Sequence, residues 1–425
     1  MPSNSYSGFL RTASPARRLH YIFVESMSSP KDDPILVWFN GGPGCSSMLG
    51  FIQEIGPYKI EDYTDQIDAN PEPWNKRANV LFLENPAGTG YTYHTNPEDL
   101  SWITDHLQSV DTFTAIRDFY DGWPEYLSNK LWITGESYAG IYGPYLAYQI
   151  HTWNKEILAK RQTGQHVTAG KEIYNLAGFI IGNGATDFNY DTAYVYAETV
   201  HHYKLINDTI YKEYQDLGCE YWYRDLRRKA NPVRCDQIYY DVVRAVFSEY
   251  NIYDLQRKKT KRETPAAEGR ILQQDHHLLK SDPIDTPYVS EYLNKAEVRE
   301  ALHIPKQVPK FEVCNDQILD GYRTQLEGSV WIYNAMMKDY RILHYSGNTD
   351  AAVATAGTKK WIKNQNYPVT KAEREYKTDG VFTGHITEYG NFWFATVNGT
   401  GHMAPQWKRK EVTQLITNFV HGIPI

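Results

Sequence analysis

One short segment of the chain carries the residue types of a nucleophile elbow. Residues 135–140 read Gly-Glu-Ser-Tyr-Ala-Gly, the G-x-S-x-G pattern with alanine in place of the last glycine. Such a turn lies between a strand and a helix and exposes the hydroxyl of Ser137 at the edge of a sheet. The apolar run 131–134 predicts that strand, and 139–150 predicts that helix. The pattern alone is weak evidence, so its weight depends on partners elsewhere in the chain.

A serine hydroxyl becomes a nucleophile only when a base takes its proton and an acid orients that base. Asp350 and His402 each directly follow an apolar run that predicts a strand, so both are expected where active sites of α/β sheets assemble. The order serine, acid, histidine is the one that a nucleophile elbow uses. His385 is the main rival among the 14 histidines, but no strong strand is expected to deliver it. We therefore predict a triad of Ser137, Asp350 and His402.

The tetrahedral intermediate of acyl transfer needs backbone N–H donors for its oxyanion. The amide of Tyr138, directly after the nucleophile, supplies one. A second is expected from the glycine-rich loop 40–47, which follows the predicted strand 34–39. A phosphate-binding loop is the competing interpretation, but no Gly-Lys-Ser/Thr follows it.

The elements that must position these residues form an α/β pattern with an interruption. Helical segments, notably 105–120, separate the later strands, which predicts a mostly parallel sheet covered on both faces. Between 187 and 326 the buried-strand runs disappear, and tyrosine, charge and helical periodicity dominate. We therefore predict a core of residues 1–186 and 327–425 with a cap inserted at 187–326. The apolar runs that predict strands are 21–24, 34–39, 80–83, 131–133, 178–181, 341–345 and 392–397.

Bulk composition excludes some classes of function. The 425 residues carry a net charge of −7 and no arginine-rich stripe, which disfavours nucleic acid as a partner. No apolar run approaches the ~20 residues that span a bilayer. The 34 tyrosines suit either a wide, half-wet cleft or a large interface between subdomains.

The four cysteines, Cys45, Cys219, Cys235 and Cys314, form no C-x-x-C pair, which disfavours zinc and thioredoxin-like chemistry. Two disulfides in an oxidising compartment is the preferred interpretation, and free buried thiols the alternative. No signal peptide is visible at the N-terminus. We expect a mature segment behind an added methionine, and a protein that stays in a reducing compartment is the alternative.

Two surface features of the sequence invite modification. The preferred interpretation of the basic run 257–262 is a solvated loop. The alternative is a loop that trypsin-like proteases cleave. Asn207 and Asn398 each begin a glycosylation sequon. Asn207 is the glycosylation candidate, because Asn398 lies close to the expected catalytic loop.

Several blocks together resemble the serine carboxypeptidase family, which includes carboxypeptidase Y, the wheat enzymes and cathepsin A. They run in the family's order from about residue 6 to the C-terminus. The resemblance implies an α/β-hydrolase fold with a largely helical cap, and a peptidase that needs no cofactor or metal. The blocks are Trp38 to Ser47, Glu54 to Pro57, Asn85 to Tyr91, Gly135 to Gly140, Ile181 to Gly184, Tyr292 to Asn294, and Gly401 to Pro405.

The same resemblance assigns roles to individual positions. It implies a nucleophile at Ser137, a base at His402, an acid at Asp350, and oxyanion donors at Gly42 and Tyr138. Asn40, Glu54 and Glu136 match residues that bind the free C-terminal carboxylate of the substrate, and Met403 matches a residue beside the pocket for the leaving amino acid. It also implies the disulfide Cys45–Cys314, which leaves Cys219 to pair with Cys235.

The chemistry of the two glutamates can be argued independently. Two carboxyl groups that face a third cannot all be ionised at close range, so at least one keeps its proton. A protonated carboxyl donates a hydrogen bond to the substrate carboxylate, and Asn40 donates another. Such a site is expected to work best in acid, as in a lysosome or vacuole, although secretion is also compatible.

The chain departs from the family pattern in places that could change substrate preference. Asn348 stands where aspartate is common, and residues 406–410 are more basic than usual. The cap also lacks the cysteine pairs that usually bracket its processed loop.

The leading hypothesis is a carboxypeptidase that removes single residues from the C-termini of peptides or proteins through an acyl-enzyme. An acyltransferase that passes the acyl group to an alcohol is the first alternative, and a catalytically idle binding or protective subunit is the second. The retained Asn40, Glu54 and Glu136 favour the peptidase. The oligomeric state is left open between monomer and homodimer.

Overall fold

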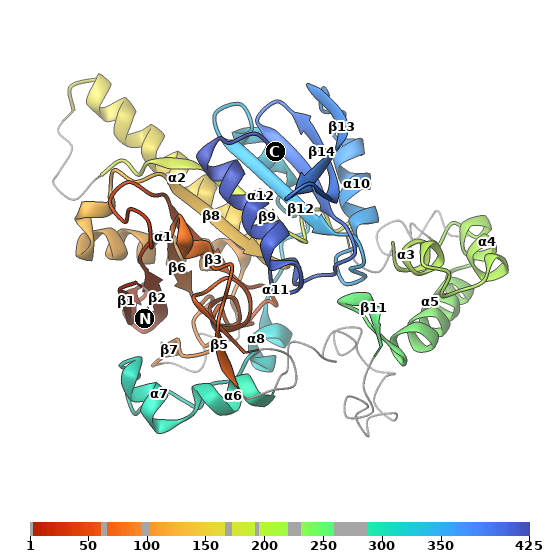
Figure 1. The fold of residues 1–425 in the computed structure, drawn as a ribbon, viewed down its shortest axis with the longest axis horizontal. Helices are drawn as coiled ribbons and strands as arrows, with labels where there is room; N and C mark the ends of the chain where they lie inside the picture. Colours follow the sequence, from red (N-terminus) through yellow and green to blue (C-terminus); the bar gives the residue numbers. More distant parts are fainter. Residues whose placement is uncertain are drawn as a thin grey trace.

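An eleven-stranded sheet runs through the centre of the molecule, with helices on both of its faces (Figure 1). The computed structural model describes residues 3–60, 66–95, 102–165, 172–191, 195–219, 231–258 and 287–425. The strand order is β1-β2-β6-β3-β8-β9-β12-β15-β14-β13, and β7 pairs with β2 at one side. The bounds are β1 Ser5–Arg11, β2 Arg17–Val24, β3 Ile35–Phe39, β6 Asn79–Leu83, β7 Tyr93–His94, β8 Leu131–Glu136, β9 Leu176–Gly182, β12 Arg341–Gly347, β13 Lys371–Thr378, β14 Val381–Tyr389 and β15 Phe392–Val397.

The central strands, from β6 through β3, β8, β9 and β12 to β15, are parallel to one another, and the outer strands pair antiparallel. Strand β3 shows why the central strands are nearly all apolar. Its residues Ile35, Val37 and Phe39 pack into one hydrophobic cluster, and Leu36 and Trp38 pack into another on the opposite face. A strand buried on both faces needs an apolar side chain at every position, because successive side chains point to opposite sides.

Helices close both faces of the sheet. Helices α1, α2, α9 and α10 pack on one face, and α6, α7 and α12 pack on the other. Their bounds are α1 Asp105–Gly122, α2 Ala139–Gln162, α6 Pro287–Leu293, α7 Ala296–Ala301, α9 Val330–Met336, α10 Thr355–Asn364 and α12 Arg409–His421. Shorter elements are η1 Gly50–Glu54, β4 Tyr58–Ile60, β5 Ile67–Ala69, η2 Trp74–Lys76, η4 Pro124–Tyr126, α8 Asp316–Gly321 and α11 Ala404–Trp407.

A third hydrophobic cluster lies in the inserted segment, beside the sheet (green, Figure 1). It is built from α3 (Tyr196–His202), α4 (Asp208–Asp216), α5 (Pro232–Phe247) and the hairpin of β10 (Tyr250–Asn251) and β11 (Asp254–Lys258). Ala351, Ala352 and Met403, which belong to loops after core strands, pack into the same cluster. The later part of the insertion behaves differently, because α6 and α7 pack into the cluster of the central sheet.

The predicted α/β fold with a mostly parallel sheet and helices on both faces is confirmed. Each apolar run that predicted a strand lies in a strand of the sheet. Strands β1, β13 and β14 were not predicted, because they lie at or near the sheet edges and carry many polar residues. The prediction for His385 was wrong in this respect, since His385 lies inside β14. Its strand is antiparallel and alternates in burial, so it lacks the continuous apolar run that marks a central strand.

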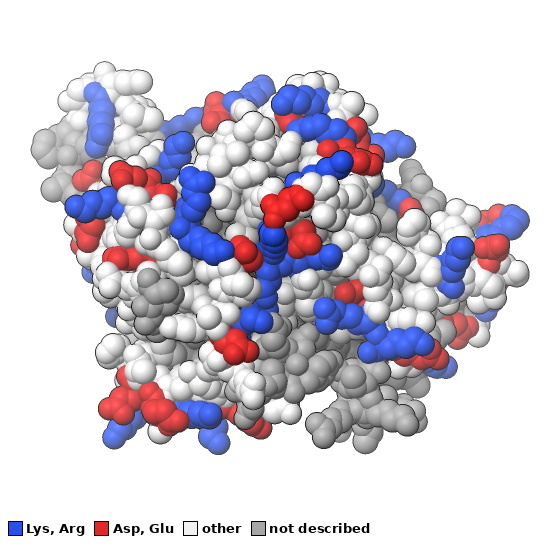
Figure 2. Space-filling view, viewed as in Figure 1, with Lys and Arg blue, Asp and Glu red and all other residues white. Residues whose placement is uncertain are grey.

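Charges of both signs lie close together over the face drawn in Figure 2. No helix within the described ranges is long and apolar enough to cross a membrane. Only the first two residues of the basic run 257–262 belong to the described chain, at the end of β11, and 259–262 lie outside it.

Candidate active site

Ser137 lies on the turn between β8 and α2, as the nucleophile-elbow pattern predicts. Its φ of 63° is in the left-handed region, which is strained for a residue with a side chain and is typical of functional turns. The turn is held from both sides, because the Ser137 N–H donates to the Gly182 carbonyl (3.1 Å) and its own carbonyl accepts from the Ala185 N–H (3.0 Å). The end of β9 and the loop that follows it therefore fix the backbone of Ser137.

The glycine-rich loop after β3 lies directly against this turn. A Cβ atom on Gly41 would stand 2.4 Å from the Tyr138 nitrogen and 2.9 Å from the Ser137 Oγ, so no other residue fits there. Gly42 has a φ of 114°. Within the described chain, no backbone carbonyl accepts a hydrogen bond from the N–H of Gly42 or Tyr138. Both groups are thus available to an oxyanion formed at the serine.

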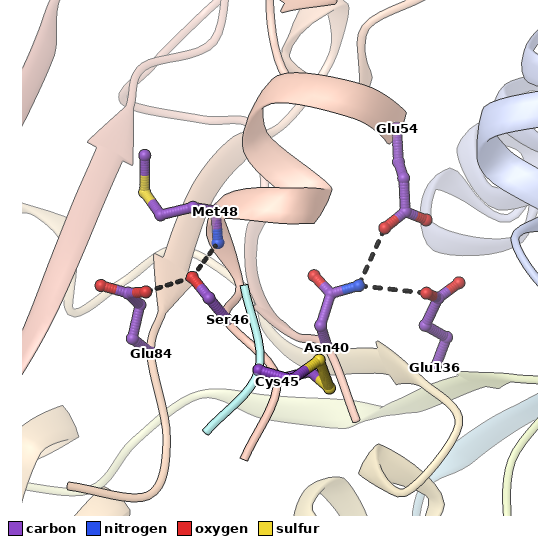
Figure 3. The surroundings of a disulfide bond; sticks show 8 residues. Asn40, Cys45, Ser46, Met48, Glu54, Glu84 and Glu136 are labelled. Atoms are coloured by element: carbon purple, nitrogen blue, oxygen red, sulfur yellow. Dashed lines mark hydrogen bonds between the residues drawn. A yellow bond between two sulfur atoms is a disulfide. The ribbon is translucent and has the colours of Figure 1, made fainter. Parts of the chain in front are cut away.

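The glycine-rich loop is anchored by a covalent bond and by a buried carboxylate. Cys45 forms a disulfide with Cys314, as the resemblance implied. Ser46 Oγ donates to Glu84 and accepts from the Met48 N–H (Figure 3). Glu84 is 1 % exposed and also contacts the His20 ring nitrogen at 2.8 Å. These contacts restrain the loop close to the nucleophile.

Asp350 and His402 meet although 52 positions separate them. Asp350 follows β12 and His402 follows β15, and these strands are parallel neighbours, so their carboxyl ends lie side by side. His402 Nδ1 is 2.6 Å from Asp350 Oδ2. Both side chains are buried. The other ring nitrogen, Nε2, has no hydrogen-bond partner in the described part of the chain and lies in a ring that lines the same pocket as Ser137.

Asn183, for which the sequence indicated no role, holds the Asp350 side chain in place. It directly follows β9, has a φ of 40° and is fully buried. Its side-chain amide donates to Asp350 Oδ2 (2.9 Å), and its Oδ1 accepts from the Gly347 N–H (2.9 Å). The backbone N–H of Ala352 donates to Asp350 Oδ1 at 2.7 Å. The only sequence signal was its place in the block Ile181 to Gly184.

Asn40, Glu54 and Glu136 line the same pocket, and the Asn40 amide lies between the two glutamates (Figure 3). Asn40 Nδ2 donates to Glu54 Oε1 (2.8 Å) and to Glu136 Oε1 (3.0 Å). Asn40 Oδ1 accepts from the Trp38 indole (2.8 Å) and from the Gly50 N–H (2.9 Å), which fixes the amide orientation. Both protons of the Asn40 amide are therefore directed at the glutamates, and not at the open pocket where a substrate would lie.

The two glutamates are poised to hold a proton. Glu54 is 2 % exposed and Glu136 is 3 % exposed. Burial raises the pKa of Glu54, and burial together with the nearby charge of Glu54 raises the pKa of Glu136 well above its usual range. Their Oε2 atoms have no hydrogen-bond partner in the described chain. The pair thus offers a carboxyl O–H donor to an anion at pH values below these raised pKa values.

The pocket that these groups share is small and mixed in polarity. Met403 lies in it, 5 % exposed, at the start of α11. His385 is not among the lining residues. No cluster of residues suited to hold a metal ion is found within the described ranges. The pocket is lined by Asn40, Gly41, Gly42, Cys45, Leu49, Gln53, Glu54, Glu136, Ser137, His402, Met403 and Gln406.

The remaining sequence-predicted positions lie outside the pocket. Cys219 and Cys235 form a disulfide inside the inserted segment. Asn207 is exposed and caps α4, and its Oδ1 accepts from the Ile210 N–H at 2.9 Å. Its Nδ2 atom, where a glycan would attach, does not make this contact. Asn398 is also exposed, and its Oδ1 accepts from Asn348 Nδ2 at 3.0 Å.

Comparisons with known proteins identify the family to which the chain is similar. A family model described as serine carboxypeptidase matches residues 1–422. A serine carboxypeptidase of Caenorhabditis elegans, ctsa-4.1, is 33% identical over 98% of this chain and 90% of its own. The lysosomal protective protein of Mus musculus is 31% identical over 99% of this chain and 90% of its own.

The fold is also found among solved structures. The crystal structure of Kex1, a prohormone-processing carboxypeptidase from Saccharomyces cerevisiae, superposes with a TM-score of 0.76 at 18% identity. It covers 99% of this chain and 91% of that one. At this identity the likeness establishes the fold alone.

Proposed function

This chain belongs to the serine carboxypeptidase family, and we propose that Ser137, His402 and Asp350 are its nucleophile, general base and orienting acid. The observation that carries the proposal is one pocket lined by Ser137, by the His402 ring, and by the buried pair Glu54 and Glu136. A hydrolase of internal peptide bonds would not need two buried carboxyl groups beside its nucleophile.

The first half-reaction forms an ester between the enzyme and the substrate. Ser137 Oγ attacks the carbonyl carbon of the last peptide bond while His402 Nε2 takes the hydroxyl proton. The N–H groups of Gly42 and Tyr138 stabilise the oxyanion. Asp350, 2.6 Å from His402 Nδ1, stabilises the imidazolium. The C–N bond then breaks, and His402 donates its proton to the amine of the leaving amino acid.

The second half-reaction returns the enzyme to its starting state. A water molecule enters, His402 takes its proton, and the resulting hydroxide attacks the ester carbonyl. The bond to Ser137 Oγ breaks, and the serine recovers its proton from His402. The shortened peptide leaves with a new C-terminal carboxylate.

Glu136 and Glu54 are proposed to select substrates with a free C-terminal carboxylate. A protonated carboxyl donates through its O–H to the substrate carboxylate, whereas an ionised one repels it. Asn40, whose amide protons already go to the glutamates, serves mainly to hold the pair. Because both pKa values are raised, the donor is present in acid and is lost as pH rises through those values. Activity is therefore expected to be favoured at acidic pH.

The other expectations follow from this proposal. An acidic compartment such as a lysosome or vacuole suits the site, and the resemblance to a lysosomal protective protein supports it; secretion is the alternative. The substrates are peptide or protein C-termini, and Asn207 is proposed to carry a glycan. The segment 187–326 is proposed as the cap subdomain.

The test is mass spectrometry of a defined peptide mixture incubated at pH ~5 and ~8, with the Ser137→Ala variant as control. We expect stepwise loss of single C-terminal residues, faster in acid, and no loss with the variant. A fluorophosphonate should label the wild type and not Ser137→Ala. Internal cleavage, or transfer of acyl groups to added alcohol in preference to water, would contradict the proposal.

A further inference from the structure

The loop that carries Asp350 is joined to the inserted segment by backbone hydrogen bonds. We call residues 346–351 the acid loop and residues 250–258, which form β10 and β11, the cap hairpin. The Leu255 N–H donates to the Thr349 carbonyl (2.9 Å), and the Ala351 N–H donates to the Ile252 carbonyl (3.0 Å). These bonds lie on both sides of Asp350, so the cap hairpin is hydrogen-bonded to the residue before Asp350 and to the residue after it.

The same hairpin also holds the loop that carries His402. We call residues 398–403 the base loop. The His402 N–H donates to the Tyr253 carbonyl at 2.7 Å. A Cβ atom on Gly401 would stand 1.9 Å from that carbonyl and 2.7 Å from the Asp254 Cβ. Glycine at 401 thus allows the hairpin backbone to lie directly on the base loop.

The Asp254 side chain is the polar centre of this junction. It is 4 % exposed and accepts from the Thr349 hydroxyl (2.6 Å), the Gln256 N–H (3.0 Å) and the Arg257 guanidinium (3.1 Å). Arg257 also lies over the Trp407 ring, 4.3 Å from its centre. The Asp254 carboxylate therefore contacts Thr349, the residue before Asp350, directly. Through Arg257 it is also connected to Trp407 in α11, the helix that follows the base loop.

A second element of the insertion reaches the acid loop. The Tyr203 hydroxyl, at the end of α3, donates to the Asn348 carbonyl at 2.5 Å. Burial and the nearby Asp254 charge raise the pKa of Tyr203 to about 12, so this hydroxyl keeps its proton. The acid and base loops also touch each other, because a Cβ atom on Gly347 would stand 2.1 Å from the Gly401 carbonyl. A shift of one loop must therefore displace the other.

We propose that the cap hairpin positions the acid–base half of the catalytic site, with Asp254 and Thr349 as the positioning residues. This rests on the proposed roles of Asp350 and His402. Neither Asp254 nor Thr349 lines the substrate pocket, so both act through the loops. Proton transfer between Ser137 and His402 needs sub-ångström alignment, and Thr349, Asp350 and His402 all lie beyond the ends of β12 and β15. The inserted segment is thus part of the catalytic scaffold and not only a cover.

The principal test removes one hydroxyl group and little volume. We expect Thr349→Val to lower kcat roughly 10-fold or more at unchanged KM, because substrate binding is untouched while the acid–base pair loses its alignment. The rate of labelling by a fluorophosphonate should fall in parallel. Thr349→Ser, which keeps the hydroxyl, should restore both rates. Thr112→Val, which removes a buried hydroxyl bonded within α1 (2.8 Å to the Gln108 carbonyl), is the matched control and should leave both rates within about twofold.

Three further variants keep the proposal testable if Thr349→Val does not fold. Asp254→Asn retains an oxygen acceptor for the Thr349 hydroxyl and should keep most of the activity, whereas Asp254→Ala should lose it with little change in KM. Tyr203→Phe should give a smaller loss of kcat, since it removes only the bond to Asn348. Melting temperatures measured on the same samples separate a loss of folded protein from a loss of turnover.

Two results would overturn the proposal. One is a Thr349→Val enzyme whose kcat and labelling rate stay within about twofold of the wild type. The other is a loss that Thr349→Ser does not restore. Ser137→Ala distinguishes this from a failure of the proposed function. If that variant is inactive while Thr349→Val is normal, only the role of the hairpin is wrong; if it cleaves peptides as fast as the wild type, the proposed nucleophile is wrong.

Discussion

The two halves of the candidate active site are held by different kinds of restraint. The nucleophile and the glycine-rich loop are fixed by close backbone contact at Gly41, by the disulfide Cys45–Cys314 and by the buried carboxylate of Glu84. The acid and base loops are held by hydrogen bonds, from Asn183 on the core side and from the cap hairpin on the other.

The difference teaches that the two halves should fail in different ways. Steric and covalent restraints survive small local changes, because close backbone packing and a disulfide do not depend on a single polar side chain. Hydrogen bonds between loops depend on each donor and acceptor being present. The nucleophile half should therefore be sensitive to loss of its cross-link, and the acid–base half to single polar substitutions.

The largest expected effect comes from removing one disulfide at a time. Cys45 and Cys314 are 269 positions apart, and Cys219 and Cys235 are 16 apart. From chain entropy, loss of the long-range bond should lower the free energy of unfolding by about 5–6 kcal/mol, and loss of the short-range bond by about 3 kcal/mol. Double cysteine-to-serine variants, compared by chemical denaturation, check this order. The reverse order would mean that strain or residual structure outweighs loop length.

The next effect concerns the core-side anchor of the acid. Asn183→Ala should lower kcat roughly 100-fold at nearly unchanged KM, because Asp350 loses its amide donor and the acid loop loses its link to β9. Asn175→Ala is the matched control, since Asn175 precedes the same strand at its opposite end and donates to the Ser128 carbonyl (2.8 Å). Steady-state kinetics of both variants decide the point, and equal losses would show a general effect on β9.

The carboxylate pair should control pH dependence and not the chemical step. In the Glu54→Gln, Glu136→Gln double variant the amides cannot ionise, so the fall in kcat/KM for peptides with rising pH should flatten. In the wild type the donor form exists below the raised pKa values and is lost above them, which is why its activity should fall. Esters without a free carboxylate should be cleaved within about threefold of wild type.

The control for this pair is Glu388→Gln, a buried carboxyl (4 % exposed) that pairs with Arg374 on the outer strands. Its pH profile should match the wild type. Equal losses on peptides and esters in the double variant would argue against a carboxylate-binding role.

The smallest expected effect is a shift of the pH profile through Arg409. Its guanidinium donates to the carbonyls of Gln53 (2.6 Å) and Glu54 (2.8 Å), and its charge lowers the pKa of Glu54 against the larger effect of burial. Arg409→Gln should therefore move the alkaline limb of kcat/KM for peptides upward, because the pKa of Glu54 rises when this charge is removed. Lys410→Gln is the control, because its ammonium pairs with exposed Asp379. A downward shift would contradict this role.

Much of the fold was predictable because central parallel strands appear in the sequence as continuous apolar runs. A strand such as β3, buried on both faces, must be apolar throughout, and the segments on either side of it supplied turn and glycine signals. Strands β13 and β14 could not be found in the same way. Residues 371–378 of β13 include lysine, arginine and glutamate at the sheet edge, where charge is compatible with pairing and protects the edge.

The candidate site also contains residues that a local sequence pattern indicates and residues that no local pattern indicates. The meeting of Ser137, Asp350 and His402 at one edge of the sheet could be predicted, because each follows a recognisable strand and the carboxyl ends of parallel strands lie together. Asn183 and Asp254 could not, since each acts through a contact that spans 167 or 95 positions and leaves no local pattern. The direction of the Asn40 amide, toward the glutamates, also depends on Trp38 and Gly50, which only the folded chain brings together.

The sequence by itself determined the α/β core, the turn that carries Ser137 and the choice of candidate reacting groups, because these depend on local periodicity and on short motifs. Tertiary structure alone decided what holds those groups at bonding distance. That support comes from buried polar contacts between distant segments, and the free energy of such contacts depends on burial and geometry that no linear pattern encodes.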